Sequence, residues 1–213
     1  MKSTTSSAVS ASRLEAFCDG VIAIAITLLV LEIKVPNLDN SSASRLLTNL
    51  ASRGPMFLAT VLSFLIIGCY WVNHHRLMRL FRHVDHGFVL LTLLWLLCLC
   101  LIPFSTGVLG ETILQADSIK TSAPVYLFGL ALPATAWALG WHYGVANQLV
   151  APEVSSDVRE KLKRIFYLSA AAHSLWVVVS FYAPRLALAI GTFQALSYLR
   201  PLELPSGRPP PDL

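Results

Sequence analysis

The chain has 213 residues, of which 55% are hydrophobic and only 13% are charged, and its mean hydropathy is +0.62. Soluble globular domains carry about 25% charged residues, so this composition excludes an ordinary soluble enzyme and a nucleic-acid-binding module. The net charge of +4 comes from basic residues in short segments between apolar runs, which indicates membrane topology rather than phosphate binding. We therefore expect an all-α integral membrane protein with membrane lipid, and no nucleic acid, as a partner.

The apolar residues gather in long runs, and a helix needs about 20 mostly apolar residues to cross a bilayer. In chain order the runs cover residues 17–35, 55–72, 88–109, 123–145 and 165–199. The last run is too long for one crossing and divides at 183–185, which leaves a sixth helix of about 15 residues. Pro103 lies inside the third run, where a proline kinks or ends a helix. The sequence predicts six transmembrane helices.

The basic residues predict the orientation of the chain in the membrane. With the N-terminus placed inside, 11 of the 16 lysines and arginines fall in inner segments and 5 in outer loops. An excess of basic residues marks the cytoplasmic side, so we expect both termini in the cytoplasm. The proline-rich C-terminal sequence is typical of disorder. The expected organisation is a cytoplasmic tail at 1–12, a six-helix domain at 13–200 and a disordered cytoplasmic tail at 201–213.

The sequence contains no recognisable catalytic or metal-binding set. The four cysteines all fall in apolar runs, where cysteine acts as a small hydrophobe; they are Cys18, Cys69, Cys98 and Cys100. His74 and His75 are adjacent, so their side chains point about 100° apart on a helix. The HExxH, Walker, GxSxG and TVGYG patterns are absent. We expect no enzymatic activity, no metal site and no cofactor.

Asp19 stands out because it lies inside the first apolar run. A carboxylate at membrane depth is costly and is usually paired or functional. An interfacial position near the positive end of the helix dipole is an equally good interpretation. Sequence spacing alone does not decide between these two interpretations of Asp19.

The first helix also has a stripe of residues that share one face. Ile24, Thr27, Leu28 and Leu31 are spaced i, i+3, i+4 and i+7. The opposite face is apolar as well, so periodicity does not tell which side meets lipid, protein or water. These residues alone do not distinguish a transporter from a channel.

Three linked sequence patterns carry a resemblance to a known family. They are RLEAFCDGVIAIAITLLVLEIKVP from residue 13, SFLIIGCYWVNHHRL from residue 63, and VDHGFVLL with LIPFSTGVLGE up to residue 111. Together they resemble the bacterial branch of the transmembrane protein 175 family of potassium channels. The family signature Arg-x-x-x-Phe-Ser-Asp corresponds to Arg13, Phe17, Cys18 and Asp19, and its Trp-x-x-His corresponds to Trp71 and His74.

This resemblance implies a polar cluster that ties helix one to helices two and three. Its members would be Arg13, Phe17, Cys18, Asp19, Trp71, His74 and Thr92. Two of them depart from the family pattern, because Cys18 replaces serine and Thr92 replaces an expected asparagine. A cysteine makes a weaker hydrogen bond than a serine, so the detail of the cluster is expected to differ while the fold is retained.

The resemblance also implies an assembly and a pore. One six-helix repeat per chain implies a homotetramer in which four copies of helix one line a central pore. The family places a ring of large apolar side chains five residues after the motif aspartate, which is Ile24 here. Leu28 and Leu31 would lie on the same stripe, with a threonine layer at Thr27. Such a ring blocks by dewetting when closed and favours the more easily dehydrated potassium ion when open.

The implied function is a leak-type potassium-permeable channel in a bacterial plasma membrane, with K⁺ as the permeant ion and other monovalent cations as further candidates. The alternative is a secondary transporter or proton-coupled carrier that uses Asp19 and His74 as a relay. Helix one has no glycine or proline near the membrane midplane. This favours the channel, since transporters commonly use interrupted helices. A third class, a structural or assembly membrane protein, would need neither the polar cluster nor a central axis.

Overall fold

A computed structural model of the chain describes residues 10–34 and 43–198. Within these residues the chain is helical and forms no β-strand. The helices are α1 (Ala11–Leu31), α2 (Ala43–Ser52), α3 (Gly54–Met78), α4 (His86–Cys100), α5 (Ile102–Thr112), α6 (Ile119–Ala146), α7 (Ser156–Ser180) and α8 (Pro184–Ser197). The predicted all-α class is confirmed.

Four helical segments are long and apolar enough to cross a membrane, judged by length and composition. They are α1, α3, the joined segment His86–Thr112 formed by α4 and α5, and α6. The remaining two predicted crossings correspond to α7, whose first half is charged, and to α8, which has only 14 residues. For these two helices the crossing stays a prediction.

Prolines mark the helix boundaries where the sequence predicted them. The third segment breaks at Leu101, and Pro103 occupies the first turn of α5, where its missing N–H costs nothing. The long C-terminal run divides between Ser180 and Pro184, and Pro184 begins α8. α2 was not predicted, because its ten residues alternate leucines with polar residues and never form a long apolar run. Most of the two predicted tails lies outside the described residues, at 1–9 and 199–213.

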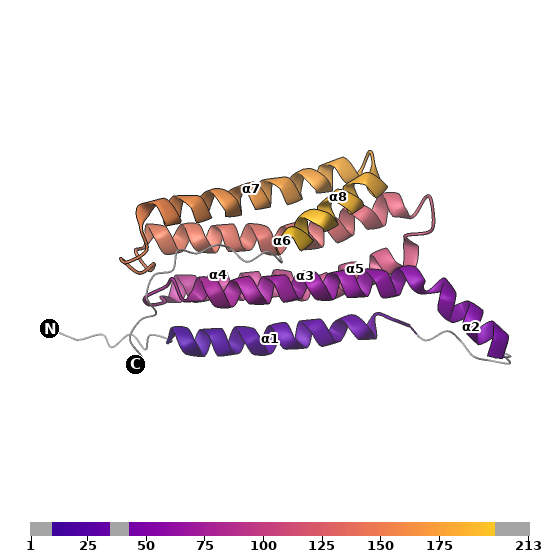
Figure 1. Cartoon of the computed structure of the whole chain (residues 1–213), viewed down its shortest axis with the longest axis horizontal. Coiled ribbons are helices and arrows are strands. Elements are labelled where there is room, and N and C mark those ends of the chain that lie inside the picture. Colours follow the sequence, from indigo (N-terminus) through magenta and orange to yellow (C-terminus); the bar gives the residue numbers. More distant parts are fainter. Residues whose placement is uncertain (1–9, 35–42, 199–213) are drawn as a thin grey trace.

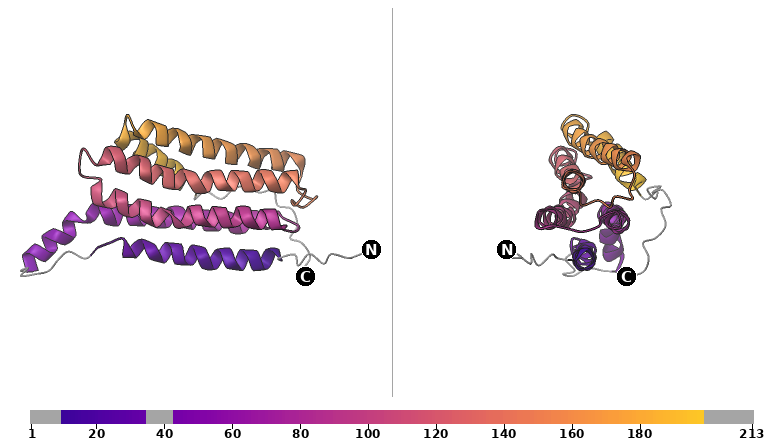
Figure 2. Two further views of the ribbon diagram at one scale, coloured as in Figure 1. Left: turned by 180° about the vertical axis from the view of Figure 1, so that it is seen from behind. Right: turned by 90° about the vertical axis from the view of Figure 1, so that its left-hand side faces the viewer.

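The long helices run nearly parallel to one axis, with α1 along one side of the bundle and α2 projecting obliquely from one end (Figure 1). α1 packs against α3, α4 and α5, while α6, α7 and α8 pack together on the far side of those helices. The end-on view in Figure 2 shows the same order, with α1 at the edge remote from α7. A core of aromatic rings joins α4, α6 and α7, where Trp95, Trp137, Trp141 and Phe166 contact one another. α1 is thus a peripheral helix of the single chain.

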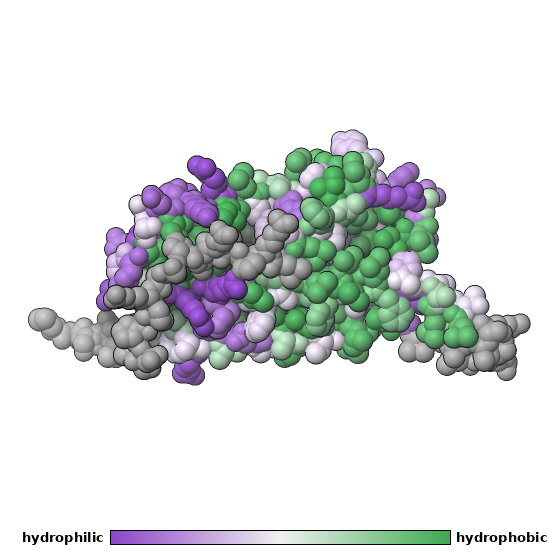
Figure 3. Space-filling model, in the orientation of Figure 1, coloured by the Kyte–Doolittle hydropathy of each residue, from purple (hydrophilic) through white to green (hydrophobic). Residues whose placement is uncertain are grey.

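The molecular surface has the polarity of a membrane protein. Apolar residues form a broad region over the middle of the bundle, and hydrophilic residues gather toward its two ends (Figure 3). Large side chains such as Phe64, Leu97 and Phe104 are exposed on the sides of these helices. In water these side chains would be unfavourable, whereas against lipid they cost nothing.

α3 and α5 approach closely at Gly110. A Cβ on Gly110 would lie 3.1 Å from the backbone Cα of Met56 and would overlap the sulfur of that side chain. We predict that Gly110→Ala pushes α3 and α5 apart and lowers the stability by about 1–3 kcal/mol. Thermal denaturation of the purified protein in detergent measures this loss.

Gly140→Ala is the matched control, because a Cβ there meets no atom within 4 Å. It also lies in a helix, so alanine should raise the stability by up to about 1 kcal/mol. Equal melting temperatures for the two variants would contradict the close approach of α3 and α5.

Candidate functional site

α1 has two faces, and only one of them belongs to the core of the chain. The buried residues of α1 recur every three or four positions and pack against the neighbouring helices. They are Leu14, Cys18, Ile22, Ala25 and Leu29. The side chain of Ser10 caps the helix by accepting the N–H of Arg13. The described helix then continues without proline to Leu31.

The other face of α1 carries the predicted pore stripe. Ile24 is 61% exposed and Leu31 is 73% exposed, and Leu28 and Thr27 are exposed beside them. Phe17 lies on the same stripe and is also exposed, so it does not pack into a polar cluster within the chain. The structure therefore places all four stripe residues on a surface of α1 that the other described helices do not cover.

Thr27 has a defined hydrogen-bonding role on this surface. Its Oγ1 donates to the carbonyl oxygen of Ile24 at 2.8 Å. The hydroxyl hydrogen is therefore used within the helix, and the lone pairs of the oxygen remain free to accept from water. The stripe is apolar apart from this acceptor.

Asp19 is joined to Trp71, as the predicted cluster requires. The indole Nε1 of Trp71 donates to Asp19 Oδ1 at 2.9 Å, which links α1 to α3. A hydrogen bond to a charged acceptor is stronger than a neutral one. Arg13 is exposed, and within the described residues no ion pair joins it to Asp19.

Within the described residues, no hydrogen bond or ion pair joins Asp19 to the other members of the predicted cluster. His74 is 1% exposed and stacks on Trp95, with ring centroids 4.8 Å apart and planes inclined by 7°. Neither of its ring nitrogens has a hydrogen-bond partner in the described part of the chain. The hydroxyl of Thr92 donates to the carbonyl of Phe88 within α4. Cys18 is fully buried on the core face of α1.

Comparison with known proteins shows which family the chain belongs to. A family model described as the endosomal/lysosomal potassium channel TMEM175 matches residues 13–103. A protein of Streptomyces collinus named a potassium channel is 36% identical over 187 residues, which are 87% of this chain and 90% of the relative. The chain belongs to the TMEM175 family.

A second named relative and a solved structure also match most of the chain. A protein of Chamaesiphon minutus named a potassium channel is 34% identical over 179 residues, covering 84% of this chain and 88% of the relative. The crystal structure of a lysosomal potassium-selective channel TMEM175 homolog from the same organism superimposes with a TM-score of 0.78 at 30% identity. That match covers 89% of this chain and 96% of the solved one.

The anchor of α1 in this TMEM175-family protein contains a second contact that the sequence analysis missed. Glu15 Oε1 lies 2.6 Å from His75 Nδ1. Glu15 and Asp19 are one turn apart on α1, and His75 and Trp71 are one turn apart on the antiparallel helix α3. The two pairs therefore form a ladder of two rungs, which we call the α1–α3 ladder. The i, i+4 repeat on both helices was the signal that could have revealed it.

A third polar contact holds the opposite end of α1. Glu111, at the end of α5, lies 3.2 Å from Lys34 and 3.4 Å from Arg53. Lys34 follows α1 and Arg53 precedes α3, so one carboxylate connects three helix ends. α1 is thus attached by polar contacts at both ends and by apolar packing between them.

The bond between Asp19 and Trp71 is tested by a double-mutant cycle of Asp19→Ala and Trp71→Phe. We predict a coupling energy of about 1–3 kcal/mol, because each single change already removes the hydrogen bond. Thermal stability of the assembled protein is the measurement. Asp19→Ala should reduce assembly or expression more than it changes ion selectivity, and strictly additive effects would contradict the predicted link.

Cys18 is predicted to be structural rather than redox-active. Its thiol is fully buried, so a membrane-permeant maleimide should label it slowly, whereas the half-buried Cys100 in α4 serves as the faster control. Cys18→Ser should change the stability by no more than about 1 kcal/mol. Rapid labelling of Cys18 with a change in conductance would show that the site is open.

Proposed function

We propose that the protein is a potassium-permeable, leak-type channel and that the exposed stripe of α1 lines its conduction path. The observation that carries this proposal is the position of the stripe. Ile24, Thr27, Leu28 and Leu31 face away from their own chain, in a family whose similar members are named potassium channels. A face that its own bundle leaves bare can meet copies of itself around an axis.

The proposed assembly is a homotetramer of six-helix chains. Four α1 helices enclose the pore, and α6, α7 and α8 lie on the side of each chain remote from the axis. The separation of α1 from these three helices within the bundle supports this arrangement. The proposed location is the bacterial plasma membrane with both termini in the cytoplasm, in line with the asymmetry of lysines and arginines.

The proposed gate is a ring formed by Ile24. An isoleucine ring offers a cation no replacement for its hydration shell, so a narrow ring excludes water and ions together. A wider ring passes ions that keep part of their water, and the weaker hydration of potassium then gives it the advantage over sodium. Thr27 can hold water beside this ring, because its hydroxyl oxygen remains an acceptor.

A proton-coupled carrier with a relay between Asp19 and His74 is the alternative. Two observations favour the channel. Asp19 is bonded to Trp71, while His74 stacks among tryptophans, so no direct hydrogen bond connects the two. α1 is also an unbroken helix across its described length, unlike the discontinuous helices that form transporter sites.

The gate is tested by Ile24→Asn in reconstituted liposomes. We predict a rise in potassium flux of about tenfold and a weaker preference over sodium, because a polar ring lowers the dewetting barrier by roughly 1.4 kcal/mol. Ion flux and reversal potentials are the measurements.

Val30→Asn is the matched control. Val30 is 62% exposed, close to the 61% of Ile24, but it lies about 120° away around the helix. It should leave flux and selectivity unchanged. Equal effects of the two variants in correctly assembled protein, or a native mass that is not four chains, would contradict the proposed pore.

A further inference from the structure

An open groove lies between α3, α5 and α8, which we call the α3–α8 groove. Its volume is about 330 Å³, and its walls include Leu58 and Leu62 from α3, Leu109 from α5 and Leu188 from α8. It lies in the half of the bundle next to α2, where the visible surface is mostly apolar (Figure 3). An occupant of the groove therefore enters from the bilayer rather than from water.

The walls of the α3–α8 groove offer no unpaired polar side chain within the described residues. The two polar side chains that line it are Tyr126 and Thr192. The hydroxyl of Tyr126 lies 3.2 Å from Oγ of Ser63 and also hydrogen-bonds to Thr192. The other lining side chains are aliphatic or aromatic, and Leu58 and Phe193 are exposed among them. Such walls are covered best by hydrocarbon.

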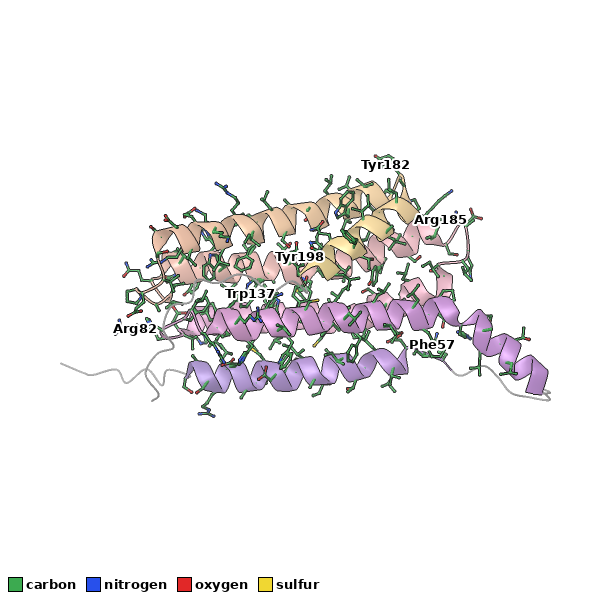
Figure 4. All side chains as sticks on the ribbon, in the orientation of Figure 1. Phe57, Arg82, Trp137, Tyr182, Arg185 and Tyr198 are labelled. Atoms are coloured by element: carbon green, nitrogen blue, oxygen red, sulfur yellow. The ribbon has the colours of Figure 1, made fainter. Side chains whose placement is uncertain are left out.

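One charged residue stands at the end of the groove. Arg185, in the first turn of α8, precedes Leu188 by three residues and Ala189 by four, so it shares the face of α8 that lines the groove. It is exposed, and no ion pair or hydrogen bond joins it to another described residue. Figure 4 shows Arg185 at the beginning of α8 and Tyr198 just after its end. An unpaired guanidinium is well suited to bind a phosphate.

The acidic residue at the end of α5 does not neutralise Arg185. Glu111 is already paired with Lys34 and Arg53. It also lies two residues after Leu109, which lines the groove, and two residues correspond to about 200° around a helix. The side chain of Glu111 therefore points away from the groove, and the charge of Arg185 remains available.

The length of the groove matches an acyl chain. Its α8 wall extends from Leu188 to Leu196, and eight residues of helix measure about 12 Å. The hydrocarbon of one leaflet is about 15 Å deep, half of a bilayer core. Arg185 lies one turn beyond this wall, beside the exposed Tyr182, and tyrosine is typical of the membrane interface. Apolar length and positive charge are thus arranged like the chain and the headgroup of a phospholipid.

We propose that the α3–α8 groove binds one anionic phospholipid, with an acyl chain between α3 and α8 and its phosphate on Arg185. Bound there, the lipid attaches the 14-residue helix α8 to α3 and α5. The binding does not depend on the conduction path, so the site exists whether or not the protein conducts potassium.

The probe for this site is phosphatidylglycerol with a photoreactive diazirine in its acyl chain, compared with phosphatidylcholine that carries the same group. Full-length protein in nanodiscs of unlabelled phosphatidylcholine is irradiated with either probe, and mass spectrometry maps the labelled residues. The phosphatidylglycerol probe should label the groove residues of α3 and α8 about fivefold more, because the ammonium of choline opposes Arg185. Equal labelling of the groove by the two probes would overturn the proposal.

Two variants separate the charge from the space. Arg185→Gln should remove the preference for phosphatidylglycerol, whereas Lys120→Gln should retain it, because Lys120 is exposed at the start of α6 and lines no part of the groove. Ala189→Phe should fill the groove and lower its labelling several-fold. Ala171→Phe is the matched control, since Ala171 is exposed on α7 outside the groove. Arg185 and Ala189 are themselves exposed, so these changes leave the core intact.

Three further results would also overturn the proposal. Loss of the preference in Lys120→Gln as well as in Arg185→Gln would show a general effect of charge. Labelling spread evenly over the lipid-facing helices would show ordinary contact with the bilayer. A groove that stays unlabelled in the assembled protein would show that a second copy of the chain covers it.

Discussion

Helix α1 is attached to its own chain by one face, and this constraint underlies the proposed pore. If both faces were buried, the chain would have no bare surface to place around an axis. With neither face held, a 21-residue helix would have no defined position in the bilayer. Apolar packing through Cys18 and Ile22 fixes the helix laterally, while Asp19 and Glu111 fix its two ends through polar contacts. Because lipid supplies no hydrophobic force between helices, such contacts and close packing decide helix positions in membranes.

The aromatic core is the second feature that holds the bundle together. It joins α4, α6 and α7 and accepts His74 from α3 between two tryptophans. The contacts of α1 combine apolar packing with polar contacts, whereas the contacts of this core are mainly between rings.

Much of the helical framework could be predicted from the sequence, because apolar length and proline are direct physical signals. The divisions at Pro103 and Pro184 followed from the missing N–H of proline. α2 could not be found in this way, since an amphipathic helix at the end of a bundle needs no long apolar run. The link from Asp19 to Trp71 followed from a family motif, whereas the burial of His74 among tryptophans depends on how α4 and α6 pack. No spacing within one helix contains that information.

The α1–α3 ladder also determines how α1 can move. Its rungs are one helical turn apart on two antiparallel helices, so sliding α1 by one turn, about 5.4 Å, shifts every partner by four residues. Asp19 would then face His75, and Glu15 would face Arg79, whose guanidinium already lies 3.0 Å from His75 Nε2. Both carboxylates would again meet nitrogen donors. A slide of one full turn would therefore place nitrogen-bearing side chains opposite both carboxylates again, whereas a smaller slide would break both contacts.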